Sequence, residues 1–181
     1  THSHPQMSFD LAQRLTEIML ALAFLQQSAE HLTGNHAPRA MFLTRMALAL
    51  TLAADIQSDW ILLALSIHSV AILHRYNGPY NGGSDRMGLL ILYCLTLSHW
   101  LPDGLASHAA FGYLAVQLVL SYFISGIVKL AQPAWRGGHA LRDVFAFSAY
   151  PVAENLRALQ GKPRLLQSAS WAVIAFEVTF P

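Results

Sequence analysis

Residues 109–130, AAFGYLAVQLVLSYFISGIVKL, decide the fold class of this chain. The run contains a single charged residue, Lys129, close to its end. A helix needs roughly 20 apolar residues to cross the hydrocarbon core of a bilayer, and this run is long enough. We therefore expect residues 109–130 to form a transmembrane helix.

The composition of the whole chain also favours a membrane setting. Apolar residues make up 54% of the sequence and charged residues only 12%, whereas a soluble domain carries about 25% charged residues. Because so few charged residues cannot cover a protein surface that faces water, we expect the chain to be surrounded by a lipid bilayer. The net charge of +1 provides no field that would recruit nucleic acid, which is therefore not an expected partner.

Five further apolar segments are candidate spans. They cover residues 9–32, 40–54, 60–73, 87–101 and 165–180. Several are short, so tilting or close packing of the helices is expected. A long polar segment, 132–164, precedes the last candidate, and we expect it to hold short amphipathic helices near 138–149 and 152–159. The predicted fold is all-α: a polytopic bundle of about six transmembrane helices in a single domain, 1–181.

The basic residues predict an orientation for this bundle. Lys and Arg occur in the first, third and fifth connections between the candidate spans, and the second and fourth connections contain none. Cytoplasmic loops collect Lys and Arg. The odd-numbered connections are therefore predicted to be cytoplasmic, with both termini on the opposite side of the membrane.

Ionisable residues inside the candidate spans are the first places to look for chemistry, because a charge in a bilayer is costly and usually faces a partner or a wet cavity. Burial favours the neutral amine of a lysine, so Lys129 is a candidate base. The alternative is that its stem lies in the bilayer and its ammonium reaches the interface. His99, beside Trp100 at the end of the fourth candidate span, is either a second candidate base or a hydrogen-bonded residue at a helix end.

A buried charge needs a partner of opposite sign, and Arg45 lies inside the second candidate span. Glu177, inside the last one, is the predicted partner. Glu17 and Glu30, which flank the apolar centre of the first span, are the alternatives. The sequence alone does not choose among the three.

The stretch NGGSD at 81–85 precedes the fourth candidate span. Ser84 or Asp85 could cap that helix. Alternatively, Gly83 and its neighbours could let a ligand approach a helix N-terminus closely. No Walker loop, dinucleotide fingerprint, zincin motif or cysteine cluster is present, so no metal site is predicted.

Three blocks of sequence resemble a known family. The run YNGPYNGGSDRM at 76–87 looks like the bacterial HTTM family, whose members share a transmembrane domain with the vitamin K-dependent γ-carboxylases. The run YFISGIVKL at 122–130 is similar to the carboxylase stretch Tyr-Phe-Ile-small-Gly-x-x-Lys-Leu. His99 and Trp100, followed by DGL at 103–105, resemble the carboxylase pattern of His and Trp shortly before Asp-Gly-Leu.

The resemblance implies a multi-pass protein of the bacterial inner membrane that binds a lipophilic, quinone-like cofactor at an intramembrane site. The carboxylase lysine that matches Lys129 deprotonates reduced vitamin K, so Lys129 would be a base towards a hydroquinone. The candidate cofactor-binding residues are Gly83, Ser84, Asp85, Trp100 and Tyr122.

Departures from the carboxylase pattern limit what the resemblance implies. Val128 stands where the carboxylases have a second lysine, and Gly82, Gly83 and Ser84 occupy the neighbourhood of their essential histidine. Carboxylases also carry a large soluble domain. Related proteins continue beyond the position of Pro181, so we expect either a C-terminally truncated domain or a short family member. Glutamate carboxylation is therefore not expected.

Two functions remain as alternatives. The first is an HTTM-type membrane protein that binds or acts on a quinone-like molecule. The second is a non-catalytic accessory or assembly subunit of a larger membrane complex, since small residues let helices approach closely. Such residues here are Gly112, Ser121, Ser125 and Gly126. A transporter is not favoured, because paired broken helices are absent. The residues leave open whether the chain is an enzyme.

Overall fold

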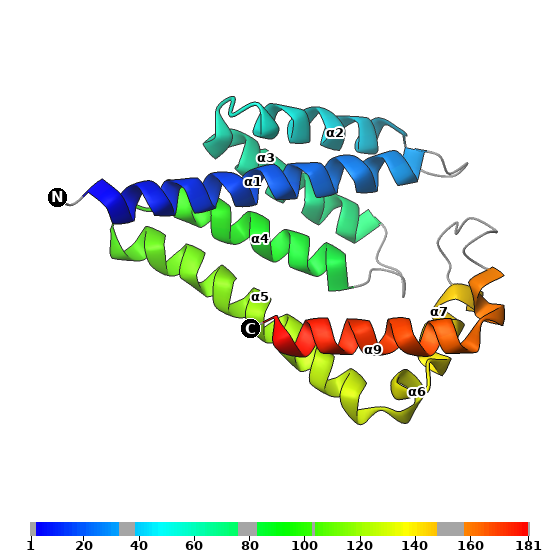
Figure 1. Ribbon diagram of the computed structural model, residues 1–181. Helices are drawn as coiled ribbons and strands as arrows, with labels where there is room; N and C mark the ends of the chain where they lie inside the picture. The colour runs from blue at the N-terminus through cyan, green and yellow to red at the C-terminus, as the bar shows by residue number, and fades with distance from the viewer. Residues whose placement is uncertain (1–2, 33–38, 76–82, 103, 148–157, 181) are drawn as a thin grey trace. The chain divides into compact units, whose positions relative to one another are not determined.

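The computed structural model describes residues 3–32, 39–75, 83–102, 104–147 and 158–180. Within these ranges the regular structure is entirely helical, without a strand, so the predicted all-α class is confirmed. Figure 1 shows the helices in chain order.

Long helices occupy all six predicted segments. They are α1 (Ser3–Leu32), α2 (Arg39–Ala53), α3 (Ser58–Arg75), α4 (Gly83–Trp100), α5 (Leu105–Ala131) and α9 (Pro163–Thr179). Between α5 and α9 lie α6 (Pro133–Arg136), α7 (His139–Phe147) and the 3-10 helix η1 (Ala158–Gly161). The helix α7 confirms the first predicted short helix, whereas most of the second, 152–159, lies outside the described residues.

Among the described helices, α5 is the one that is long and apolar enough to cross a membrane. Only 11% of its most apolar stretch is buried. The helices α2 and α9 are 15 and 17 residues long, shorter than the roughly 20 residues that a span needs. Length and apolarity therefore do not support the predicted bundle of six spans. The reason is that the other helices are too short, or carry too many polar and charged residues.

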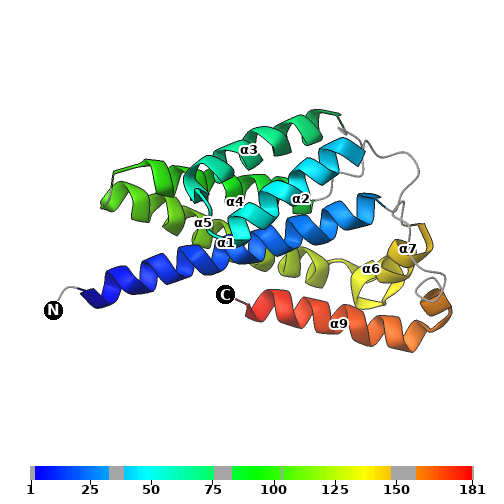
Figure 2. The same cartoon turned by 90° about the horizontal axis from the view of Figure 1, so that it is seen from above.

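The chain divides into two compact units, residues 1–114 and 115–181, and α5 is continuous through both. The prediction of one domain therefore stays a prediction. In the first unit α1 packs along α2, and α3 packs against both α2 and α4, as Figure 2 shows from above. Its buried core comes from these four helices: Leu20, Ala21, Phe24, Ala49, Leu52, Leu62, Leu65, Leu92 and Leu95.

A tight turn joins α2 to α3 and brings acidic side chains to one end of the first unit. Asp55 and Gln57 adopt positive φ angles of 58° and 49°, a conformation that a short polar side chain tolerates better than a bulky one. The Ser58 hydroxyl donates to Asp55 Oδ1 at 2.8 Å. The turn therefore fixes Asp55 and, at the start of α3, Asp59.

In the second unit α9 comes very close to α5 at Gly126. A Cβ atom on Gly126 would lie 2.8 Å from Val178 Cγ2 and 3.0 Å from the Val178 backbone nitrogen. Only glycine leaves room for this approach. The contact lies one helical turn from Lys129, so it also sets where the end of α9 meets that side chain.

Candidate functional site

The predicted site residues of the first unit do not lie together. Asp85 lies in the first turn of α4, and His99 and Trp100 lie in its last turn. At 1.5 Å of rise per residue, Asp85 and His99 are about 21 Å apart along the helix. Lys129 and Tyr122 belong to the second unit. Asp85 and His99 therefore do not share one intramembrane site, and the predicted role of Lys129 in such a site stays a prediction.

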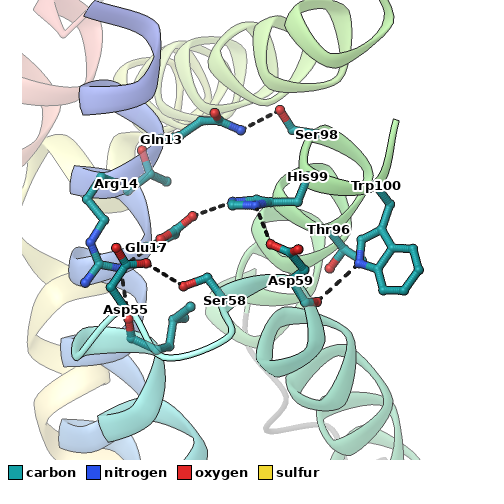
Figure 3. A network of polar contacts seen from close by, with 12 residues as sticks. Gln13, Arg14, Glu17, Asp55, Ser58, Asp59, Thr96, Ser98, His99 and Trp100 are labelled. Atoms are coloured by element: carbon teal, nitrogen blue, oxygen red, sulfur yellow. Dashed lines mark hydrogen bonds and ion pairs between the residues drawn. The ribbon is translucent and has the colours of Figure 1, made fainter. Parts of the chain in front are cut away.

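His99 is held between two carboxylates, as Figure 3 shows. Its Nε2 lies 2.6 Å from Glu17 Oε1, and its Nδ1 lies 3.0 Å from Asp59 Oδ1. An ionised carboxylate only accepts hydrogen bonds, so both ring nitrogens must donate, and only the imidazolium carries two N–H groups. The two contacts thus fit an imidazolium that donates from both ring nitrogens. It has no free nitrogen with which to take a substrate proton, so the geometry fits the alternative of a hydrogen-bonded residue at a helix end.

Glu17 is the centre of this cluster. Its side chain is 3% exposed, and Arg14 Nη1 donates to its Oε2 at 2.8 Å. Arg14 also donates to the backbone oxygens of Leu52 at 2.9 Å and Ala53 at 2.6 Å. These carbonyls end α2 and have no partner within their own helix. Arg14 therefore neutralises Glu17 and caps α2 at the same time.

Trp100 joins α4 to α3. Its Nε1 donates to the Asp59 backbone oxygen at 3.2 Å. Its ring meets that of Trp60 edge to face, with centroids 4.7 Å apart. It does not line the cavity beside His99. Trp100 thus makes a packing contact between α3 and α4, and its predicted cofactor contact stays a prediction.

A cavity of about 430 Å³ opens beside the Glu17–His99 pair. It is lined by Phe9, Asp10, Gln13, Arg14, Glu17, Asp55, Ser98, His99, Gly104, Ser107 and His108. This volume lies in the range of small-molecule sites. Charged and hydroxyl groups dominate the lining, so the cavity fits a polar molecule better than a quinone.

Asp85 forms the second cluster, together with residues of α1 and α2. Its Oδ1 accepts a hydrogen bond from Gln27 Nε2 at 2.6 Å. Because α4 begins at Gly83, Asp85 lies within the first turn rather than at the cap. Its carboxylate accepts a hydrogen bond from α1. The side chain of Ser84 lies outside the part of the chain that the structure describes, as does any contact of Gly83.

Arg45 lies close to Asp85 and is only 4% exposed. Its Nε donates to Ser28 Oγ at 2.8 Å. The rings of Phe24 and Phe42 flank its guanidinium at 5.2 and 5.3 Å, which fits cation–π contacts. Among the described residues Arg45 has no ion pair. The predicted pairing of Arg45 with Glu177 is wrong, because the carboxylate of Glu177 is bound elsewhere.

Lys129 and Glu177 form the third cluster. Lys129 Nζ lies 2.5 and 2.6 Å from the two oxygens of Glu177 and 2.9 Å from Ser125 Oγ. These contacts use all three ammonium hydrogens. The ammonium also lies 5.1 Å from the centre of the Trp135 ring. The Lys129 side chain is therefore paired with Glu177 rather than extended to water.

Three aromatic rings of the second unit, those of Tyr122, Phe176 and Phe180, lie against one another. Tyr122 lies 4.7 Å from Phe180 and 6.1 Å from Phe176, measured between ring centroids. These rings belong to α5 and to the last turns and end of α9. Tyr122, a predicted cofactor contact, is thus part of an aromatic surface in the same unit as Lys129.

Sequence reasoning missed the partners that define these clusters. Glu17 and His99 are 82 residues apart, and Lys129 and Glu177 are 48 residues apart. The available signal was that each of these charges lies in or next to an apolar segment and must be neutralised. That signal identifies the charges but not the pairs.

The chain matches no protein-family profile, no curated protein and no solved structure. Among the described residues, no group of three or more His, Cys, Asp and Glu side chains is placed to hold a metal ion. The resemblance to the HTTM family stays a prediction.

Proposed function

We propose that this chain is an integral, multi-pass membrane protein of the HTTM type that binds a lipophilic, quinone-like molecule beside the Lys129–Glu177 pair. The observation that carries the proposal is the pair itself. An ammonium and a carboxylate lie in direct contact between two helices, and the same two helices carry the aromatic cluster of Tyr122, Phe176 and Phe180. The proposed location is the bacterial inner membrane.

The distribution of side chains supports a membrane environment for more helices than α5. Large apolar side chains are exposed on α1, α2, α3, α4 and α9 as well, among them Leu15, Met19, Leu43, Leu50, Ile67, Leu97, Trp171 and Phe176. Buried positions instead include Glu17, Ser28, Arg45 and Ser66. An apolar exterior with charges inside suits a lipid surrounding. The short helices would then require a locally thin bilayer.

The pair offers a definite chemistry towards a hydroquinone. The hydroquinone O–H bond breaks, and its proton moves to a carboxylate oxygen of Glu177. As Glu177 takes up this proton it releases one ammonium hydrogen of Lys129, and that hydrogen bonds to the phenolate oxygen that forms. In this proposal Glu177 is the base and Lys129 stabilises the product anion. The resemblance to the carboxylases had instead assigned the base to Lys129.

Binding of 2-methyl-1,4-naphthoquinone to the protein in lipid nanodiscs tests this proposal, with quenching of tryptophan fluorescence as the readout. We expect Lys129→Met and Glu177→Gln each to weaken binding at least about tenfold. Glu30→Gln, the same change on an exposed carboxylate of the first unit, serves as the control and should bind as the native protein does. The proposal would be contradicted if the native protein did not bind the naphthoquinone, or if all variants bound it equally well.

A second function, a non-catalytic subunit of a larger membrane complex, is favoured by α5. Most of its apolar stretch is not covered by the chain itself, and another subunit could cover it as well as lipid could. Native mass spectrometry of the protein released gently from its own membrane separates the two functions. A stable complex with other proteins supports the subunit function, and a lone protein carrying a quinone supports the first.

A further inference from the structure

A small cavity lies inside the first unit, where its four main helices meet. Its volume is about 30 Å³. The polar groups that line it are Arg45 of α2, Ser69 of α3 and Asp85 of α4. Apolar side chains complete the wall: Phe24, Ile72, Leu73 and Leu89. Gln27 and Ser28 of α1 are hydrogen-bonded to Asp85 and Arg45, respectively.

Two polar atoms at this cavity have no hydrogen-bond partner among the described residues: Arg45 Nη2 and Ser69 Oγ. Both atoms are buried, and Arg45 as a whole is more than nine-tenths buried. Buried polar groups in proteins are nearly always hydrogen-bonded, to protein or to ordered water. Leaving a charged donor unpaired costs more than leaving a neutral one. Something therefore has to accept a hydrogen bond from Arg45 inside this cavity.

The lining restricts what that occupant is. Arg45 would repel a cation, and Asp85 would repel an anion. An apolar occupant would leave both unpaired atoms unsatisfied. A neutral molecule that both accepts and donates hydrogen bonds remains, and the cavity is large enough for one water, which needs roughly 10–15 Å³.

We propose that this cavity holds one ordered water molecule that bridges the guanidinium of Arg45 to the carboxylate of Asp85. The water accepts a hydrogen bond from Arg45 Nη2 and donates one to Asp85, and the Ser69 hydroxyl is its third partner. The bridge turns the buried Arg45 and the half-buried Asp85 into a hydrated ion pair. It joins α2, α3 and α4, with α1 attached through Gln27 and Ser28.

X-ray radiolytic footprinting of the full chain in nanodiscs tests this water directly, because hydroxyl radicals made from a bound water oxidise the side chains next to it. We expect Phe24 to be oxidised in the native protein although it is only 6% exposed. The core residues Leu92 and Leu95, both fully buried, should show background labelling. In Ser69→Val the added methyl groups should expel the water, and labelling of Phe24 should be lost.

The matched control is Ser66→Val, one turn earlier on α3, whose hydroxyl donates to the Leu62 backbone oxygen and does not line this cavity. It should leave labelling of Phe24 unchanged. Background labelling of Phe24 in the native protein, or undiminished labelling in Ser69→Val, would show that the cavity is dry and overturn the proposal. If Ser69→Val does not fold, a high-resolution density map of the native protein decides the matter. Density within hydrogen-bond distance of Arg45 Nη2 supports the water, and an empty cavity refutes it.

Discussion

Glu17 is the residue on which the polar cluster at one end of the first unit depends. Both of its oxygens are occupied, one by Arg14 and the other by His99. The two cations share this one buried anion, and Asp59 and Asp55, the other nearby carboxylates, are mostly exposed. Loss of the charge of Glu17 would therefore leave two cations without a buried partner.

Replacement of Glu17 by Gln should destabilise the first unit by about 3 kcal/mol. This is the typical cost of removing one partner of a buried ion pair and leaving the other charged. The free energy of unfolding in mixed detergent micelles measures this effect. Asp10→Asn is the control, because it removes an exposed carboxylate from the same helix and should change stability by less than about 0.5 kcal/mol. Equal stability of Glu17→Gln and the native protein would show that water already solvates this cluster.

The Lys129–Glu177 pair has a structural and a proposed chemical role, and a double variant separates the two. Lys129→Met alone leaves Glu177 as an unpaired and mostly buried anion, at a cost of about 3 kcal/mol. Adding Glu177→Leu removes that anion, so the double variant should recover most of the lost stability. It should still fail to bind the naphthoquinone. If the double variant folds and binds the naphthoquinone as the native protein does, the pair has only a structural role.

The contact between α5 and α9 depends on one glycine. Gly126→Ala places a methyl group against the Val178 backbone, which cannot move without the rest of α9. We expect a loss of about 1–3 kcal/mol, as is usual for overpacking, together with weaker naphthoquinone binding because Glu177 shifts with α9. Gly112→Ala on the same helix has open space around its new Cβ atom. It should be neutral or stabilising by up to about 1 kcal/mol. Comparable losses in both variants would contradict the close contact.

The helices of this chain could be predicted from the sequence, because apolar runs separated by proline, glycine and polar turns determine where helices begin and end. Residues 60–73, for example, lie within the observed α3. The clusters could not be predicted, because each joins residues from different helices. His99 looked like a lone histidine until Glu17 and Asp59 were found at its two nitrogens. Asp85 looked like a cap because α4 begins at Gly83, before the position at which the sequence placed its first residue.

For the molecule as a whole, the arrangement in the membrane depends on how many helices cross it. Length and apolarity single out α5 among the described helices. The exposed apolar side chains and the alternation of basic connections instead favour six spans. The two arrangements differ at α3. If α3 spans, its two ends lie on opposite sides of the membrane, whereas if only α5 spans, they lie on the same side.

Single cysteines at the two ends of α3 distinguish these arrangements. Ile56→Cys and His74→Cys, each made in a chain whose buried Cys94 is replaced by Ala, leave every basic Arg and Lys in place. We expect a membrane-impermeant maleimide to label Cys at 56 in intact cells. It should label Cys at 74 only after the membrane is permeabilised, because the following connection carries Arg75 and Arg86 and is predicted to be cytoplasmic. Labelling of both positions from the same side would mean that α3 does not cross the bilayer. The polar cavity and the Arg45 cluster would then lie outside the hydrocarbon core, and the cost of burying their charges would be correspondingly lower.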